Sequence, residues 1–195
     1  MAASDTASRP IRTFKIPVRE ATPEALAPYG TVLGSLPEIP PLPINFYDGT
    51  VTVRKPAEFI TDSPAEFTVC RLQPRPMTLE FLERHPRHTQ AFLPLGGKPF
   101  IAVFAPPTPD NELPEIETLE AFEFDGTAGF MMHINTWHEF PFAVREDTDI
   151  VVVLSRDTNQ ALHDDNVIEG EAHGPDLDKR NLVARLGLRV ELETD

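Results

Sequence analysis

The chain has 195 residues, of which 31 are acidic and 17 are basic, an excess of 31 − 17 = 14 negative charges. This excess, without any long basic run, argues against a nucleic-acid partner, because phosphate contacts need clustered lysine and arginine. Hydrophobic residues make up 41% of the chain, as in a globular protein that can bury a core. The longest aliphatic run, Ile150 to Leu154, is far below the roughly 20 residues that span a bilayer, so no membrane partner is expected.

Proline and cysteine usage narrow the class of protein further. Proline accounts for 21 residues, about twice its average usage of roughly 5%. Because proline does not fit inside helices or central strands, this content predicts short strands and many turns. The one cysteine, Cys70, cannot form an intrachain disulfide and fits a reducing compartment. With no secretory signal visible at the N-terminus, we expect a cytoplasmic protein.

The N-terminal quarter of the chain predicts a tail, a strand, a helix and a hairpin. Residues 1–12 are small and polar and predict a flexible tail. Phe14 to Val18 alternates as a strand does. Thr22-Pro23-Glu24 combines an N-cap hydroxyl, a proline and an acid in the first turn, which predicts a short helix over 22–28. Asp48-Gly49 lies between two alternating segments and predicts a β-hairpin, since this pair tolerates positive φ angles.

Strand patterns dominate the rest of the chain. Alternating or apolar segments predict strands at 67–72, 77–85, 99–105, 129–133, 140–144 and 150–155. One more helix is expected over 114–122. Short strands at such intervals are typical of a mainly β fold, an antiparallel sandwich or barrel, here with two or three short helices. We expect residues 13–195 to form a single domain, with an acidic C-terminal extension from about residue 159.

A first cluster of chemically versatile residues follows the strand predicted at 77–85. Met77, Leu79, Phe81, Glu83 and His85 are all odd-numbered, so they share one face of a strand, and an apolar face runs into a Glu–His pair. At the mouth of a barrel such a pair could ligate a metal ion or act as a general base. The alternative is that the strand simply ends there and its last residues reach solvent.

A second cluster surrounds the only tryptophan. His133 and His138 flank Trp137 and are five positions apart. Imidazole is the commonest metal ligand and a good proton carrier near neutral pH. The alternative is a core tryptophan with hydrogen-bonded histidines. Arg71 has the same parity as Phe67 and Val69, so it either points inward to a substrate carboxylate or faces solvent.

At these positions the sequence resembles the ureidoglycolate lyase family. The resemblance rests on the run LERHP at 82–86, TQAF at 89–92 with a following proline, and a glycine-led segment that carries His133, Trp137 and His138. Tyr29-Gly30 and the Arg71-x-x-Pro74 segment fit it as well. The chain departs from the family at Glu139 and Phe140, where the family often has histidine and proline.

The resemblance implies a cupin-type β-barrel, usually a homodimer, that splits (S)-ureidoglycolate into glyoxylate and urea during allantoin degradation. It implies a carboxylate-bearing substrate and an associated divalent metal ion, nickel or zinc, although the residues could also act without a metal. The expected catalytic residues are Glu83, His85, His133 and His138; the expected substrate-binding residues are Arg71, Gln90 and Trp137; the expected metal ligands are His85, His133 and His138. The alternatives are a cupin enzyme acting on another small carboxylate or sugar, and a non-catalytic cupin that binds a small ligand.

Overall fold

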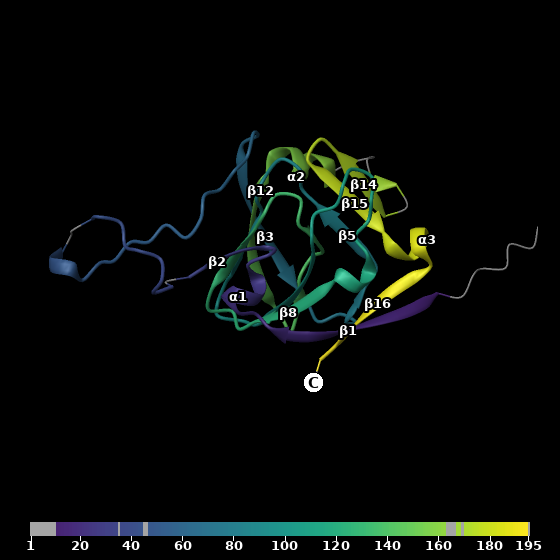
Figure 1. The fold of residues 1–195 in the computed structure, drawn as a ribbon, viewed down its shortest axis with the longest axis horizontal. Helices are drawn as coiled ribbons and strands as arrows, with labels where there is room; N and C mark the ends of the chain where they lie inside the picture. Colours follow the sequence, from purple (N-terminus) through teal and green to yellow (C-terminus); the bar gives the residue numbers. More distant parts are fainter. Residues whose placement is uncertain (1–10, 35, 45–46, 163–166, 169, 195) are drawn as a thin grey trace, which may run out of the picture.

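The computed structural model describes residues 11–34, 36–44, 47–162, 167–168 and 170–194. Its chain is mainly β, as expected, and forms two curled sheets (Figure 1). The smaller sheet has five strands in the order β2 (Gly30–Leu33), β9 (Gly129–Met132), β6 (Ala91–Pro94), β12 (Thr148–Ser155) and β3 (Ala65–Leu72). Every pair in this sheet is antiparallel.

The larger sheet has eleven strands. Along its path lie β13 (Val167–Ile168), β14 (Glu171–Gly174), β15 (Leu177–Asn181), β5 (Phe81–Arg84), β10 (Trp137–His138), β7 (Phe100–Ala105), β8 (Glu120–Phe124), β1 (Arg12–Glu20), β16 (Leu188–Glu193) and β4 (Thr78–Leu79), and β11 (Phe142–Ala143) pairs with β7. The antiparallel expectation is wrong for one strand, because β1 runs parallel to both β16 and β8. No hairpin joins β1 to either neighbour, so connection length does not force them antiparallel.

The larger sheet packs against two hydrophobic clusters, one of which also contains side chains of the smaller sheet and so joins the two sheets. Strand β7 is buried on both faces because it lies in the middle of the larger sheet. Phe100, Ala102 and Phe104 face a cluster shared with the smaller sheet, whereas Ile101 and Val103 face a second cluster formed with β1, β16 and Trp137. The core between the sheets is rich in phenylalanine, and it positions the inner faces of both sheets on either side of a cavity.

Three short α-helices are described: α1 (Pro23–Leu26), α2 (Arg156–Leu162) and α3 (Leu182–Leu186), together with 3₁₀ turns η1 (Tyr47–Gly49) and η2 (Ile116–Thr118). The helix predicted at 22–28 is confirmed as α1, where Thr22 Oγ1 accepts a hydrogen bond from Ala25 N at 3.2 Å. None of the described helices is long and apolar enough to cross a membrane.

Other predicted elements need correction. The helix predicted at 114–122 is instead η2 followed by β8, because Ala121, Phe122 and Phe124 become buried between β7 and β1. The strand predicted at 77–85 is divided into β4 and β5. Of the predicted hairpin, residues 45–46 lie outside the described residues, and residues 50–53 form no strand. Residues 36–44 and 47–55 instead extend away from both sheets (Figure 1), whereas Ala57 and Phe59 pack against the smaller sheet.

The structure can be compared with the predicted N-terminal tail and the predicted C-terminal extension. Of the predicted tail, residues 1–10 lie outside the described residues, and Arg12 already begins β1, where its backbone N–H donates to Gly187 O at 2.9 Å. The extension from residue 159 adds strands to the larger sheet, with β15 beside β5 and β16 beside β1. The organisation as a single domain stays a prediction.

Candidate active site

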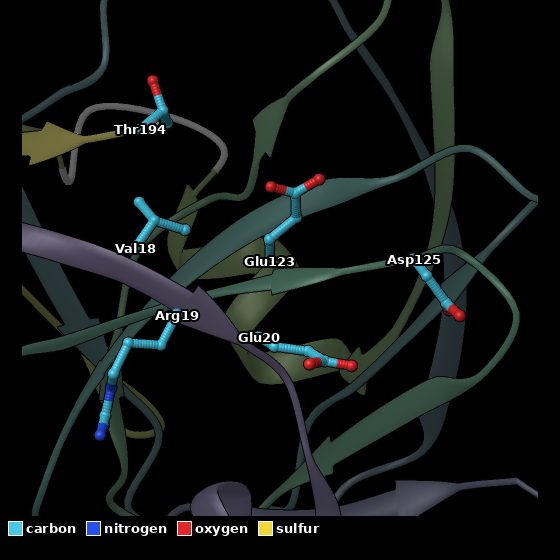
Figure 2. Close-up of a pocket in the computed structure, with 6 residues that line it drawn as sticks. All are labelled: Val18, Arg19, Glu20, Glu123, Asp125 and Thr194. Carbon is cyan, nitrogen blue, oxygen red and sulfur yellow. The ribbon is translucent and has the colours of Figure 1, made fainter.

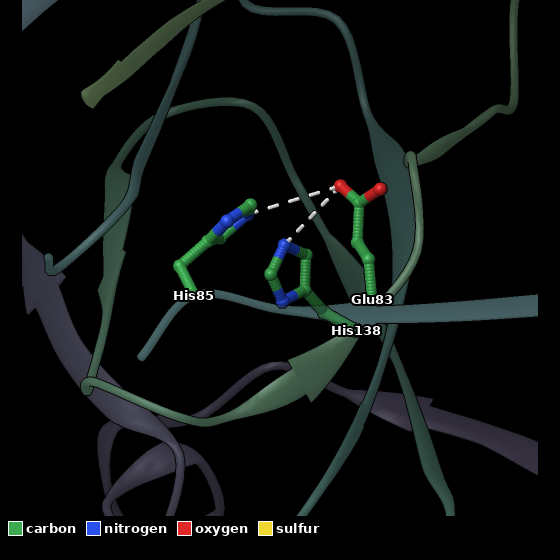
Figure 3. A group of neighbouring side chains, drawn as sticks. All are labelled: Glu83, His85 and His138. Carbon is green, nitrogen blue, oxygen red and sulfur yellow. Dashed lines mark ion pairs between the residues drawn. The ribbon is translucent and has the colours of Figure 1, made fainter. Parts of the chain in front are cut away.

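Three adjacent strands of the larger sheet place charged and imidazole side chains in one row. In the pairing of β15 with β5, Lys179 lies opposite Glu83, and in the pairing of β5 with β10, Glu83 lies opposite His138. Directly opposite residues on neighbouring strands have side chains close enough to interact. His85 follows β5 by one residue and returns to the same side as Glu83 (Figure 3). The row therefore joins residues that are far apart in the sequence.

Glu83, His85 and His138 form a compact, buried cluster. Glu83 Oε1 lies 3.6 Å from His138 Nε2 and 3.9 Å from His85 Nε2, and all three side chains are at most 4% exposed. Figure 3 shows both imidazoles turned toward the same carboxylate oxygen. Of the four expected catalytic residues, the structure brings Glu83, His85 and His138 together.

Backbone carbonyl groups determine the tautomer of each imidazole. His85 Nδ1 lies 3.0 Å from Asp176 O, and His138 Nδ1 lies 2.9 Å from Thr136 O. Since a carbonyl oxygen only accepts, each Nδ1 carries the proton and donates. Each Nε2 therefore presents a lone pair toward the cluster. The Gln90 side-chain amide donates to His85 Nε2 at 3.0 Å, and His138 Nε2 has no hydrogen-bond partner among the described residues.

Burial and neighbouring charge set the protonation states. Burial lowers the pKa of His85 to about 3 and also lowers the pKa of His138, so both rings are neutral at neutral pH. Burial raises the pKa of Glu83, but the charge and hydrogen bond of the Lys179 ammonium, together with the neighbouring imidazoles, more than offset burial and hold that pKa below its usual range. The cluster thus combines one ionised carboxylate with two uncharged imidazoles.

A cavity of about 170 Å³ lies between the two sheets and reaches Glu83. Two of its polar lining residues, Glu83 and Gln90, belong to the cluster or contact it. The remaining lining comes from the inner face of the smaller sheet, from α2 and from the loop after β10: Thr68, Cys70, Phe92, Phe140, Val152, Leu154, Asn159 and Leu162. A mostly apolar cavity with a few converging polar groups is the usual form of a small-molecule site.

A larger hollow, of about 300 Å³, lies at the end of β1 (Figure 2). Its lining is Val18, Arg19, Glu20, Glu123, Asp125 and Thr194, so the hollow has no histidine among the described residues that line it. It lacks the neutral proton carriers found beside the smaller cavity. The smaller cavity is therefore the candidate active site.

The cluster has the chemistry of a divalent-metal site. Glu83, His85 and His138 each offer one ligand atom, and these atoms lie within 4.8 Å of one another. The imidazole lone pairs face inward, and each opposite ring nitrogen donates to a carbonyl, which is how metal-bound histidines are usually oriented. The unpartnered His138 Nε2 fits the same role. This donor set suits Zn²⁺ or Ni²⁺.

Three residues expected at the site lie elsewhere. His133 is exposed in the turn after β9, where its backbone N–H donates to Tyr29 O at 2.9 Å. It does not join the cluster, because the strand ends one residue earlier. Arg71 is 62% exposed and forms a salt bridge with Asp149 at 2.8 Å, since β3 turns its odd-numbered side chains outward. Trp137 lies in the core on the other face of β10 from His138.

Sequence reasoning missed two side chains around the cluster, both in the C-terminal extension. Lys179 on β15 bonds Glu83 directly, at 2.9 Å. Asp176 is fully buried, accepts from His88 Nδ1 at 2.7 Å and from Arg87 N at 2.8 Å, and offers its carbonyl to His85. Neither residue belongs to a motif, and only the sheet pairing brings them to β5. Strand periodicity would have placed Lys179 on a face but not opposite Glu83.

A buried Glu-His-His cluster beside an enclosed cavity, within a mainly β fold, defines a small-molecule enzyme site with acid–base or metal chemistry. The sequence model of the family described as ureidoglycolate lyase matches residues 13–176 of the chain. The chain belongs to this family.

Individual relatives agree with this assignment. Ureidoglycolate lyase of Pseudomonas savastanoi pv. phaseolicola (strain 1448A / Race 6) is 33% identical over 144 residues, which cover 71% of this chain and 82% of that protein. The enzyme of the same name from Azotobacter vinelandii (strain DJ / ATCC BAA-1303) is 35% identical over 50% of this chain and 60% of its own length. That of Escherichia coli (strain SMS-3-5 / SECEC) is 37% identical over 49% and 59%.

Proposed function

We propose that the chain is a carbon–nitrogen lyase that splits (S)-ureidoglycolate into glyoxylate and urea. The observation that carries this proposal is the ionised Glu83 carboxylate in the wall of the cavity, backed by two neutral imidazoles. The cavity, at about 170 Å³, is smaller than the roughly 300–1,000 Å³ of sites for drug-sized ligands. It suits a substrate as small as ureidoglycolate.

The reaction transfers one proton from oxygen to nitrogen on the same substrate. The carbon that bears the carboxylate also bears a hydroxyl group and the ureido nitrogen. Removing the hydroxyl proton lets the C–O bond become a carbonyl while the C–N bond breaks, and the departing nitrogen needs a proton. Glu83 is ionised and lines the cavity, so its Oε1 is the acceptor for the hydroxyl proton, which it then returns to the nitrogen.

Other side chains hold the substrate and exclude water. Gln90 donates its amide N–H to His85, which leaves its Oε1 unpartnered, buried and able to accept from the ureido N–H groups. The apolar walls, among them Phe92 and Leu154, keep water away from the reacting atoms. Arg71 does not contribute, because it faces away from the cavity.

Exchange of Glu83 tests this proposal. We expect Glu83→Gln to lower kcat for urea release from ureidoglycolate by about 10²–10⁴-fold, the usual contribution of a general acid–base group. The matched control is Glu80→Gln, because Glu80 pairs with Arg189 at 2.6 Å outside the cluster, and it should retain near wild-type activity. If Glu83→Gln and Glu80→Gln were equally active, Glu83 would not be the base.

We also propose that the site holds one divalent ion, nickel or zinc. Its ligands would be His138 Nε2 and His85 Nε2, the latter in place of its hydrogen bond from Gln90, with Glu83 Oε1 beside them as the proton acceptor. When bound, the ion supplies a Lewis acid that stabilises negative charge on the substrate oxygens. Elemental analysis of protein prepared without a histidine tag should find about one metal ion per chain, and a metal-free preparation with full activity would contradict the proposal.

The remaining parts of the proposal are a cytoplasmic location, which the single cysteine supports, and, from the family resemblance, a cupin-type barrel, a role in allantoin degradation and a homodimer. Exposed apolar side chains support the dimer, since Phe67 and Val69 on the outer face of β3 are 72% and 64% exposed. Val51, Val53 and Ile60 in the preceding segment are also exposed. Light scattering should give the mass of two chains, and the mass of one chain would contradict the dimer.

A further inference from the structure

Lys179 is a buried ammonium group held between two buried carboxylates. Its Nζ lies 2.9 Å from Glu83 Oε2 and 2.9 and 3.0 Å from the two oxygens of Glu139. The side chain of Lys179 is only 14% exposed, and those of Glu83 and Glu139 are 4% and 8% exposed. The rings of Phe81 and Phe140 lie 5.6 and 5.3 Å from the ammonium nitrogen and cover it.

We propose that Lys179 is a positioning residue for the Glu83 base, with Glu139 as the counter-charge that fixes the lysine. The inference rests on the proposed function, in which Glu83 accepts the hydroxyl proton. It assigns a role to the C-terminal extension, because Lys179 lies beyond residue 176, where the family match ends.

The two oxygens of the Glu83 carboxylate have different partners. Oε2 is bound to Lys179, whereas Oε1 faces His85 and His138. A charge-assisted hydrogen bond to one oxygen fixes the rotation of the whole carboxylate. The second oxygen is thereby presented to the two imidazoles. The backbone supports this contact, because Lys179 and Glu83 are direct partners in the pairing of β15 with β5.

Glu139 restrains the lysine from the opposite side. It follows β10 directly, and both of its oxygens bond Lys179. Its carboxylate also accepts from the backbone N–H of Phe140 at 2.8 Å, which holds it in place. Because one cation lies between two carboxylates, the ammonium group cannot move toward one glutamate without lengthening its contact with the other. The three side chains form a rigid unit whose outer end is Glu83 Oε1.

A simpler role would be that Lys179 only neutralises Glu139, so that no bare carboxylate is buried. The two roles predict different results for a double substitution. Lys179→Met leaves two buried carboxylates without their cation, and adding Glu139→Gln removes one of those charges. If neutralisation were the only role, the second substitution would restore both stability and activity. If Lys179 positions Glu83, the second substitution restores stability but not activity.

The experiment compares Lys179→Met, Glu139→Gln and the double variant, with Lys15→Met as matched control. Lys15 also lies near two glutamates, Glu191 at 3.9 Å and Glu193 at 3.2 Å, but on the exposed side of β1. For Lys179→Met we expect a Tm lower by on the order of 10 °C and a kcat about 10²-fold lower. KM should stay within about threefold, because Lys179 does not touch the substrate. Lys15→Met should match the wild type.

The double variant decides the question. We expect its Tm to recover by more than half while its kcat stays about 10²-fold below that of Glu139→Gln. A kcat within about threefold of Glu139→Gln would overturn the proposal. A crystal structure of the double variant gives a second result that does not depend on turnover. We expect the Glu83 carboxylate to have rotated away from His138, and an unchanged carboxylate would overturn the proposal even if the wild type failed to act on ureidoglycolate.

Discussion

The neutral state of buried His85 makes the stability of the metal-free protein depend on pH. An unfolded histidine has a pKa of about 6.5, whereas burial lowers the pKa of His85 in the fold to about 3. Below pH 6.5 the unfolded chain therefore binds a proton that the folded chain does not. The free energy of unfolding consequently decreases as the pH is lowered. Between pH 6.5 and 4.5 the loss amounts to two pH units at about 1.36 kcal/mol each, or about 2.7 kcal/mol.

The assay is urea unfolding, followed by circular dichroism in the presence of a chelator, at several pH values from 7 to 4.5. Wild-type stability should fall across this range, and the advantage of the wild type over His85→Gln should shrink by about 2–3 kcal/mol. His133→Gln is the control, because that ring is exposed, and its curve should run parallel to the wild type. A constant difference between the wild type and His85→Gln across this range would refute the assigned neutral, buried state.

Four further substitutions test other parts of the structure. In a urea-release assay, His133→Ala and Arg71→Ala should each leave kcat within about twofold of the wild type. Both side chains are exposed, and Arg71 forms only a surface ion pair. A loss of about 10²-fold in either variant would place that residue at the site. Asp176→Asn should lower the free energy of unfolding by about 1–3 kcal/mol, because the N–H groups of His88 Nδ1 and Arg87 N lose a charged acceptor. An unchanged urea-unfolding curve would contradict this. Thr22→Ala should cost about 1 kcal/mol by removing the N-cap of α1, measured in the same way.

The strand content of the fold was predictable because it depends on local patterns. Alternation and turn residues located β3, β7, β9 and β12 within a few residues. The helix expected at 114–122 failed for a tertiary reason, since pairing with β7 and β1 turned the end of that segment into β8. The parallel pairing of β1 with β16 joins the two ends of the described chain, and no local pattern reports such a contact.

The residues of the candidate site were also predictable from the sequence only in part. Strand parity brought Glu83 and His85 to one face, and a histidine-rich segment pointed to His138. Parity misled for Arg71, because the apolar Phe67 and Val69 face outward and Thr68 and Cys70 line the cavity. An apolar residue on an outer sheet face cannot be told from a core residue by alternation alone. Lys179 and Asp176 reach the cluster only through the order of strands in the sheet.

The central claim is that the Glu83 site splits ureidoglycolate, and the most direct test is product analysis with the purified chain. Wild-type protein incubated with (S)-ureidoglycolate should release glyoxylate and urea in equal amounts, at a rate proportional to enzyme concentration and reduced by about 10²–10⁴-fold in Glu83→Gln. Ureidoglycolate that remains intact, while another small carboxylate is consumed, would contradict the account.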